Sequence, residues 1–125
     1  MESVVKQMNL FFDPRSVAVV GASRKIMKAG HVIFKNFVDN KRRGLFKGEL
    51  YPVNPHEPYI LGFKCNPSVA EIDGEVELVV IVVPAENVPQ VMREAAIKGV
   101  RAAVIISGGF SEIGKNELEE EVKTI

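Results

Sequence analysis

The sequence has little cysteine, no long hydrophobic stretch and no excess of charge of either sign. Its single cysteine, Cys65, excludes an intrachain disulfide and a cysteine metal cluster. The longest apolar run, residues 78–85, is far shorter than the roughly 20 residues of a membrane-spanning helix. Sixteen basic residues balance sixteen acidic ones, so net charge gives no reason to expect nucleic acid as a partner. We find no signal-peptide pattern at the N-terminus and expect a soluble cytoplasmic protein without a membrane partner.

The 125 residues are 46% hydrophobic and 26% charged, which is typical of a globular chain and excludes a disordered one. We expect residues 1–125 to form a single domain. Three β-branched runs that do not alternate with polar residues predict parallel strands buried on both faces. A weaker strand contains Pro52, which favours a sheet edge because proline donates no ladder hydrogen bond. The three runs, the weaker strand and a short fifth piece lie at residues 16–20, 78–83, 102–106, 49–53 and 62–65.

Apolar residues at three- and four-residue spacing predict helices between these strands. One covers residues 30–44 and a second covers residues 88–98, with Gly99 just past its end. A third helix is predicted after Gly114, where Asn116 provides a cap before several acids. The alternation of strands and helices predicts βαβ units with right-handed crossovers. The fold class is therefore α/β, a Rossmann-like three-layer sandwich with a mostly parallel sheet.

The predicted third helix has no closing cap, and no strand follows it. We therefore expect the chain to be truncated at its C-terminus, as a fragment of a longer polypeptide. Its last strand would then present an open edge that favours self-association into a homo-oligomer.

The turn after the first predicted strand has the composition of an anion site. Gly21, Ala22 and Ser23 follow the strand directly, and a helix begins near Gly30, so free N–H groups meet the positive end of a helix dipole. The spacing departs from the dinucleotide fingerprint, since Ser23 and Ile26 stand where its later glycines would be. A P-loop is excluded, because no Gly-Lys-Ser/Thr follows.

Three cations occupy the same turn, namely Arg24, Lys25 and Lys28. Cations are unfavourable at a helix N-terminus, so a bound anion would compensate them. The alternative is a solvated turn without a ligand.

Small residues and prolines also follow the other predicted strands, at the edge where doubly wound sheets bind ligands. Small residues let a ligand approach the backbone, although strand-to-helix turns are commonly built from them in any case. These turns are Val53-Asn54-Pro55, Val83-Pro84-Ala85-Glu86 and Ser107-Gly108-Gly109-Phe110.

Five segments match one known family in order and spacing. They are residues 12–23 (FDPRSVAVVGAS), 51–55 (YPVNP), 61–65 (LGFKC), 82–85 (VVPA) and 106–110 (ISGGF). Together they resemble the CoA-binding domain of the nucleoside-diphosphate-forming acyl-CoA synthetases, most closely that of ADP-forming acetate–CoA ligase, to which the α subunit of succinyl-CoA synthetase is related. The resemblance covers a core of about residues 10–114. Ile26-Met27 departs from it, because members usually carry proline or small polar residues there.

The resemblance implies that coenzyme A binds along the carboxyl edge of the sheet. It places the Gly21-Ala22-Ser23 turn by the CoA phosphates, and Ser107 and Gly108 near the pantetheine arm. The cofactor-binding residues that we expect are Gly21, Ala22, Ser23, Arg24, Lys25, Gly30, Val53, Asn54, Pro55, Val83, Pro84, Ala85, Ser107 and Gly108.

The family reaction converts acyl-CoA, ADP and phosphate to acid, CoA and ATP through a phosphohistidine in a later domain. Neither His31 nor His56 matches that histidine, and we expect no catalytic residue and no metal site in this chain. The implied partners are the remaining domains or subunit of the ligase, including an ATP-grasp unit, and the chain alone should be inactive. We expect His31 to be a partly exposed surface residue, His56 to be solvated and Cys65 to be a small buried hydrophobe.

Two other functions stay open. A stand-alone CoA-binding module would have the same fold and no catalytic activity. An NAD-type oxidoreductase domain is opposed by the glycine spacing, and by a second strand that ends in Val53-Asn54-Pro55 rather than in an acid that could hold a ribose.

Overall fold

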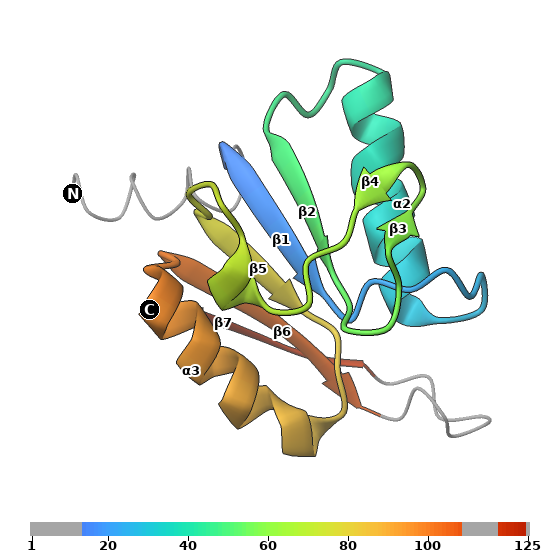
Figure 1. Cartoon of the computed structure of the whole chain (residues 1–125). Helices are drawn as coiled ribbons and strands as arrows, with labels where there is room; N and C mark the ends of the chain where they lie inside the picture. The colour runs from blue at the N-terminus through green and yellow to red at the C-terminus, as the bar shows by residue number, and fades with distance from the viewer. Residues whose placement is uncertain (1–13, 109–117, 125) are drawn as a thin grey trace.

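The centre of the molecule is a five-stranded sheet with the strand order β2-β1-β5-β6-β7 (Figure 1). The computed structural model describes residues 14–108 and 118–124. Neighbours among the first four strands of that order are parallel, and the last strand is antiparallel to its neighbour. The strands are β1 (Ser16–Val20), β2 (Glu49–Val53), β5 (Leu78–Ile81), β6 (Ala102–Gly108) and β7 (Leu118–Thr124).

Two helices cover opposite faces of this sheet and complete three layers (Figure 1). On one face Phe34 of α2 (Ala29–Arg42) packs in a core cluster that includes Val19 of β1. On the other face Val91 of α3 (Val88–Lys98) shares a core cluster with Val20. Successive residues of a strand point to opposite faces, so a strand covered on both sides is apolar throughout. This explains why the β1 run does not alternate.

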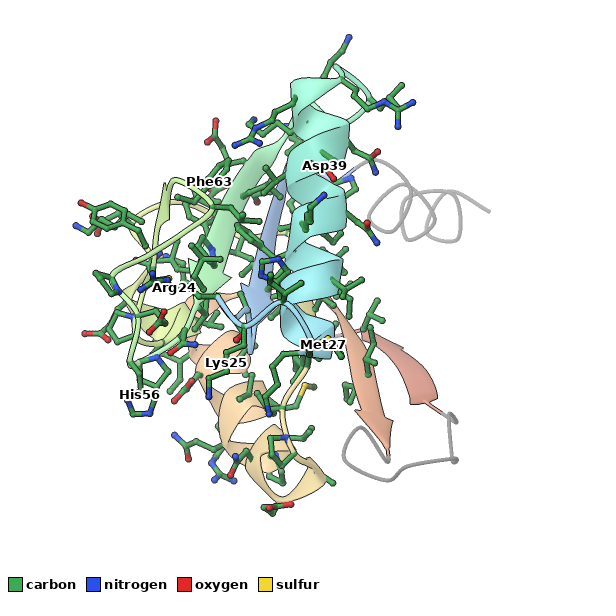
Figure 2. All side chains as sticks on the ribbon, turned by 90° about the vertical axis from the view of Figure 1, so that its right-hand side faces the viewer. Arg24, Lys25, Met27, Asp39, His56 and Phe63 are labelled. Carbon is green, nitrogen blue, oxygen red and sulfur yellow. The ribbon has the colours of Figure 1, made fainter. Side chains whose placement is uncertain are left out.

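Four shorter elements lie between the main strands and helices in the sequence. A two-stranded sheet, β3 (Tyr59–Ile60) and β4 (Phe63–Lys64), lies beside α2, where the Phe63 ring meets the Phe34 ring edge-on at 5.6 Å (Figure 2). Two 3-10 turns, η1 (Val69–Glu71) and η2 (Ala85–Asn87), precede β5 and α3 respectively. Within the described residues, Asn66 alone bridges to the outer side of β2, at Val53.

The four parallel strands and the first two helices confirm the α/β fold predicted from the sequence. β2 lies at the edge of the sheet, as Pro52 indicated. The short piece predicted at 62–65 forms one half of the β3–β4 hairpin. No helix within the described ranges is both long and apolar enough to cross a membrane.

The predicted third helix is wrong where the structure describes it. Residues 118–124 form β7, which pairs with β6 from Ala102↔Thr124 to Gly108↔Leu118. The acid-rich composition favours a helix locally, but the edge of β6 offers a full row of backbone partners, and such tertiary pairing overrides local propensity. The open β6 edge that we expected is therefore covered by β7. The predicted cap, Asn116, lies outside the described residues.

Candidate functional site

The carboxyl ends of β1 and β5 mark the place where the connections of the sheet diverge. From β1 the chain passes through α2 to β2 on one side, and from β5 it passes through α3 to β6 on the other. Doubly wound sheets bind their ligands at this topological switch point. Two loops border it, the first connection (residues 21–28) and the second connection (residues 82–87).

Gly21 and Gly30 allow three segments to approach one another at this point. Gly21 has a φ of +95°, and a Cβ atom there would lie 2.0 Å from the carbonyl oxygen of Val82. A Cβ atom at Gly30 would lie 1.9 Å from the carbonyl oxygen of Gly21. The sequence suggested that such glycines admit a ligand. The structure gives both of them a packing role, and Gly30 lets α2 approach the strand as the third glycine of a dinucleotide fingerprint does.

Hydrogen bonds tie the first two residues of the turn after β1 to the end of β2 and the residue that follows it. The Gly21 N–H donates to the carbonyl oxygen of Val53 at 3.1 Å. The Asn54 side-chain Nδ2 donates to the carbonyl oxygen of Ala22 at 2.9 Å, while its Oδ1 accepts from the His56 N–H at 2.7 Å. The turn is therefore fixed against β2 at two successive residues.

His31 fixes the next residue of the turn from the side of α2. Its Nδ1 lies 2.8 Å from the carbonyl oxygen of Ser23. A carbonyl only accepts hydrogen bonds, so Nδ1 carries the proton. The His31 side chain is buried, with 7% of its surface exposed, and our expectation of a surface histidine is wrong. The first connection supplies, at Ser23, the acceptor that a buried imidazole needs.

The three cations of the first connection are all exposed, and Figure 2 shows Arg24 and Lys25 near the N-terminal end of α2. Arg24 forms an ion pair with Glu57, with 3.3 Å between Nε and Oε2. The sequence analysis did not single out Glu57, because only the folded chain brings the loop after β2 beside the first connection. Ile26 and Met27 at the tip are 74% and 94% exposed.

The predicted site residues gather at one edge of the sheet but differ in burial. The edge is supported from inside the fold by three buried residues, Ala22, Gly30 and Val53. Arg24, Lys25, Pro55, Pro84 and Ala85 are exposed there, and Gly21, Ser23, Asn54 and Val83 are partly exposed. Ser107 and Gly108 belong to the last part of β6 and pair with β7, so the turn predicted at these two residues is wrong. Gly109 and Phe110 lie outside the described residues.

Residues with reactive side chains are few near this edge. His56 is exposed, as expected. Cys65 is 8% exposed, and burial raises the pKa of its thiol, which confirms the interpretation as a small buried hydrophobe. Within residues 14–108 and 118–124, no three His, Cys, Asp or Glu side chains gather as a metal site would require. Among the described residues, the groups that this edge offers to a ligand are backbone N–H groups, cations and small side chains.

Comparison with known proteins decides the family. Residues 15–124 match the family model described as CoA binding domain. The chain belongs to this family. An ADP-forming acetate–CoA ligase of Methanocaldococcus jannaschii is 46% identical over 112 residues, which are 90% of this CoA-binding domain and 15% of that protein. The α subunit of ADP-forming acetate–CoA ligase II of Pyrococcus furiosus is 42% identical over 118 residues, or 94% of this chain and 25% of that one.

Solved structures that resemble this chain include both long and short chains. A dinucleotide-forming acetyl-coenzyme A synthetase of Ca. Korarchaeum cryptofilum, in complex with phosphate and ADP, superposes with a TM-score of 0.75 at 37% identity. That match covers 87% of this chain and 23% of the synthetase. A conserved hypothetical protein of Pyrococcus furiosus is 39% identical with a TM-score of 0.59, over 70% of each chain. The present chain thus spans only a small part of the ligases and most of the short protein.

Proposed function

We propose that this domain binds coenzyme A along the carboxyl edge of its sheet, as the CoA-binding part of an ADP-forming acyl-CoA synthetase. The observation that carries the proposal is the turn at 21–23, fixed at the switch point beside three exposed cations. Coenzyme A carries a pyrophosphate and a 3′-phosphate. Backbone N–H groups near a helix N-terminus and mobile cations are the groups that proteins use to bind phosphates.

The proposed contacts differ along the edge. The backbone of the 21–23 turn binds the pyrophosphate, and the exposed side chains of Arg24 and Lys25 neutralise phosphate charge. Pro55, Pro84 and Ala85 are exposed small or rigid residues, which form the rim against the adenosine. The pantetheine arm then passes near Ser107 and Gly108. Gly30, Val53 and Val83 support this edge through the packing of the elements behind it.

For the whole protein we propose the interconversion of acid, CoA and ATP with acyl-CoA, ADP and phosphate in the cytoplasm. The ligases and α subunits that resemble this chain are four to six times longer, which supports further domains or a partner subunit with the nucleotide chemistry. The phosphohistidine belongs to that part, since His56 is exposed in a loop and His31 is buried with Nδ1 bound to a carbonyl. The role of this domain is to hold CoA and present its thiol.

A stand-alone CoA-binding module is the second candidate. The short protein of Pyrococcus furiosus favours it, because the present chain covers 70% of that protein. Both candidates share the binding step, and only the ligase requires the remaining domains.

Ligand choice tests the binding step. CoA should raise the melting temperature of the domain, since a ligand at a hundredfold excess over its dissociation constant stabilises by about 2.7 kcal/mol. NAD at the same concentration should have little effect. Equal or greater stabilisation by NAD would contradict the proposal.

An activity assay separates the two candidates. The domain is mixed with acetate, CoA and ATP, with and without the remaining ligase domains, and acyl-CoA is measured. We expect turnover only in the complete mixture. CoA binding with no turnover in the complete mixture would favour the stand-alone module, whereas turnover by the domain alone would contradict both.

A further inference from the structure

Two side chains hold successive carbonyl groups of the turn after β1. Asn54 donates to the carbonyl oxygen of Ala22 at 2.9 Å, and His31 donates to that of Ser23 at 2.8 Å. In a trans peptide unit the C=O and the following N–H point in opposite directions. The Ser23 N–H therefore points away from Asn54 and β2, and the Arg24 N–H points away from His31 and α2.

The two N–H groups that these bonds orient are free of partners in the described part of the chain. The Gly21 N–H donates to Val53 and the Lys25 N–H donates to the Ser23 Oγ at 3.0 Å, whereas the Ala22 N–H, like the other two, has no partner among the described residues. β5 lies on the opposite side of β1 from β2, so the Ser23 N–H points toward the switch point. Unpaired N–H groups in a turn of this kind are anion-binding groups.

We propose that His31 and Asn54 are positioning residues, which fix the Ala22 and Ser23 carbonyls so that the Ser23 and Arg24 N–H groups face the pyrophosphate of the ligand. The inference rests on the proposed function, because it names what orients the site proposed there. Neither side chain needs to touch the ligand. Asn54 has both ends of its amide engaged with the chain, and His31 is buried with its Nδ1 bound to Ser23.

Packing alone does not account for a histidine at this position. His31 lies on the buried side of α2, whose other buried side chains, Phe34 and Val38, are apolar. An apolar residue would fill the space without the cost of desolvating an imidazole. The hydrogen bond to Ser23 is what the imidazole adds, and it selects one orientation of the turn.

The test compares two replacements of His31 in the otherwise unchanged chain. His31→Asn keeps an N–H donor close to the position of Nδ1, whereas His31→Leu keeps an apolar side chain that suits the helix and removes the donor. Calorimetric titration with CoA should give a dissociation constant about tenfold higher for His31→Leu, the size expected for one lost hydrogen bond, and close to wild type for His31→Asn. Asn54→Ala should behave like His31→Leu.

Amide NMR spectra provide the readout that a merely structural role would not move. On addition of CoA to wild type and to His31→Asn, the Ser23 and Arg24 amide protons should shift downfield as they bond to phosphate. In His31→Leu these shifts should be lost, while the β5 and β6 amides keep their wild-type positions. If His31→Leu does not fold, Asn54→Ala carries the same measurement.

The outcomes separate the two proposals. Wild-type affinity and wild-type amide shifts in His31→Leu and Asn54→Ala would overturn the positioning role and leave CoA binding intact. Weakened binding in His31→Asn equal to that in His31→Leu would also overturn it, because the donor would then not matter. A wild-type domain that does not bind CoA at all would overturn the proposed function and this inference with it.

Discussion

The first and second connections leave neighbouring strands at the same edge but are built in different ways. The first connection, residues 21–28, carries three exposed cations on a backbone that is tied to β2 and α2. The second connection, residues 82–87, contains no cation, and Pro84 and a 3-10 turn carry it into α3. One loop thus supplies charge and N–H donors, while the other supplies a rigid rim. In the proposed site, electrostatic attraction and shape come from separate segments and can be changed separately.

The largest effect is expected where the two connections touch. Gly21→Ala would push a Cβ atom against the Val82 carbonyl in addition to straining a positive φ, and should lower the free energy of unfolding by about 3 kcal/mol or more. Gly99→Ala is the matched control, because Gly99 has a φ of +86° and open space around it. The control should lose only about 1 kcal/mol. Urea unfolding followed by circular dichroism measures both, and equal losses would show that the contact with Val82 is unimportant.

Removing the charge of the first connection should have the next largest effect. With Arg24, Lys25 and Lys28 all changed to Ala, the dissociation constant for CoA should rise about tenfold, since exposed cations contribute modestly one by one. The dependence of binding on salt should also decrease. The control changes Arg42, Arg43 and Lys47, three exposed cations at or just beyond the other end of α2. Titration of each variant with CoA at two salt concentrations measures both effects. A similar rise in the dissociation constant of the control would mean that net charge, and not the position of the cations, determines the affinity.

A change in the second connection should lower the free energy of unfolding and not alter the salt dependence of CoA binding. Pro84 has a φ of −54°, and Pro84→Ala gives the unfolded chain more freedom, which should cost about 0.5 kcal/mol of folding free energy. The salt dependence of CoA binding should stay as in wild type. A changed salt dependence in this variant would contradict the division between charge and shape.

The smallest effect concerns Glu57, which pairs with Arg24 and would compete with the ligand for it. Glu57→Gln removes the partner 3.3 Å from Arg24 and one negative charge near the proposed phosphates, so CoA should bind about twofold more tightly. Glu75→Gln, at an exposed acid before β5, is the control and should leave binding unchanged. Weaker binding in Glu57→Gln would instead assign Glu57 a role in holding Arg24 ready for the ligand.

Much of the fold could be predicted because its signals are local. The runs at 16–20 and 49–53 match β1 and β2 residue for residue, since glycine, proline or polar residues bound them. The helix at 88–98 matches α3, and Gly99 past its end adopts the left-handed conformation expected of a helix C-terminus. The helix predicted at residues 118–124 is wrong for the opposite reason. Their strand conformation depends on pairing with β6, which no local propensity records.

In the candidate site, too, some features could be predicted from the sequence and others could not. Its place at the carboxyl edge followed from the order of the elements, and the exposed cations Arg24 and Lys25 followed from their position in a turn. The buried state of His31 did not, because the Ser23 carbonyl that satisfies its Nδ1 reaches the ring only once the first connection has folded. The contact of Gly21 with Val82 and the Arg24–Glu57 pair likewise join segments that are distant in sequence.

The pairing of β1 with β5 also has a consequence for how the chain acquires its binding competence. These strands are neighbours in the sheet, with Val17 opposite Leu78, although β2 and the β3–β4 hairpin lie between them in the sequence. Closing so long a segment costs chain entropy that nearby contacts do not, and such non-local pairing slows folding. The two connections cannot face each other before that closure, however early β1, α2 and β2 assemble. The rate at which the proposed CoA binding appears during refolding should therefore report on this long-range step, and not on the formation of helices.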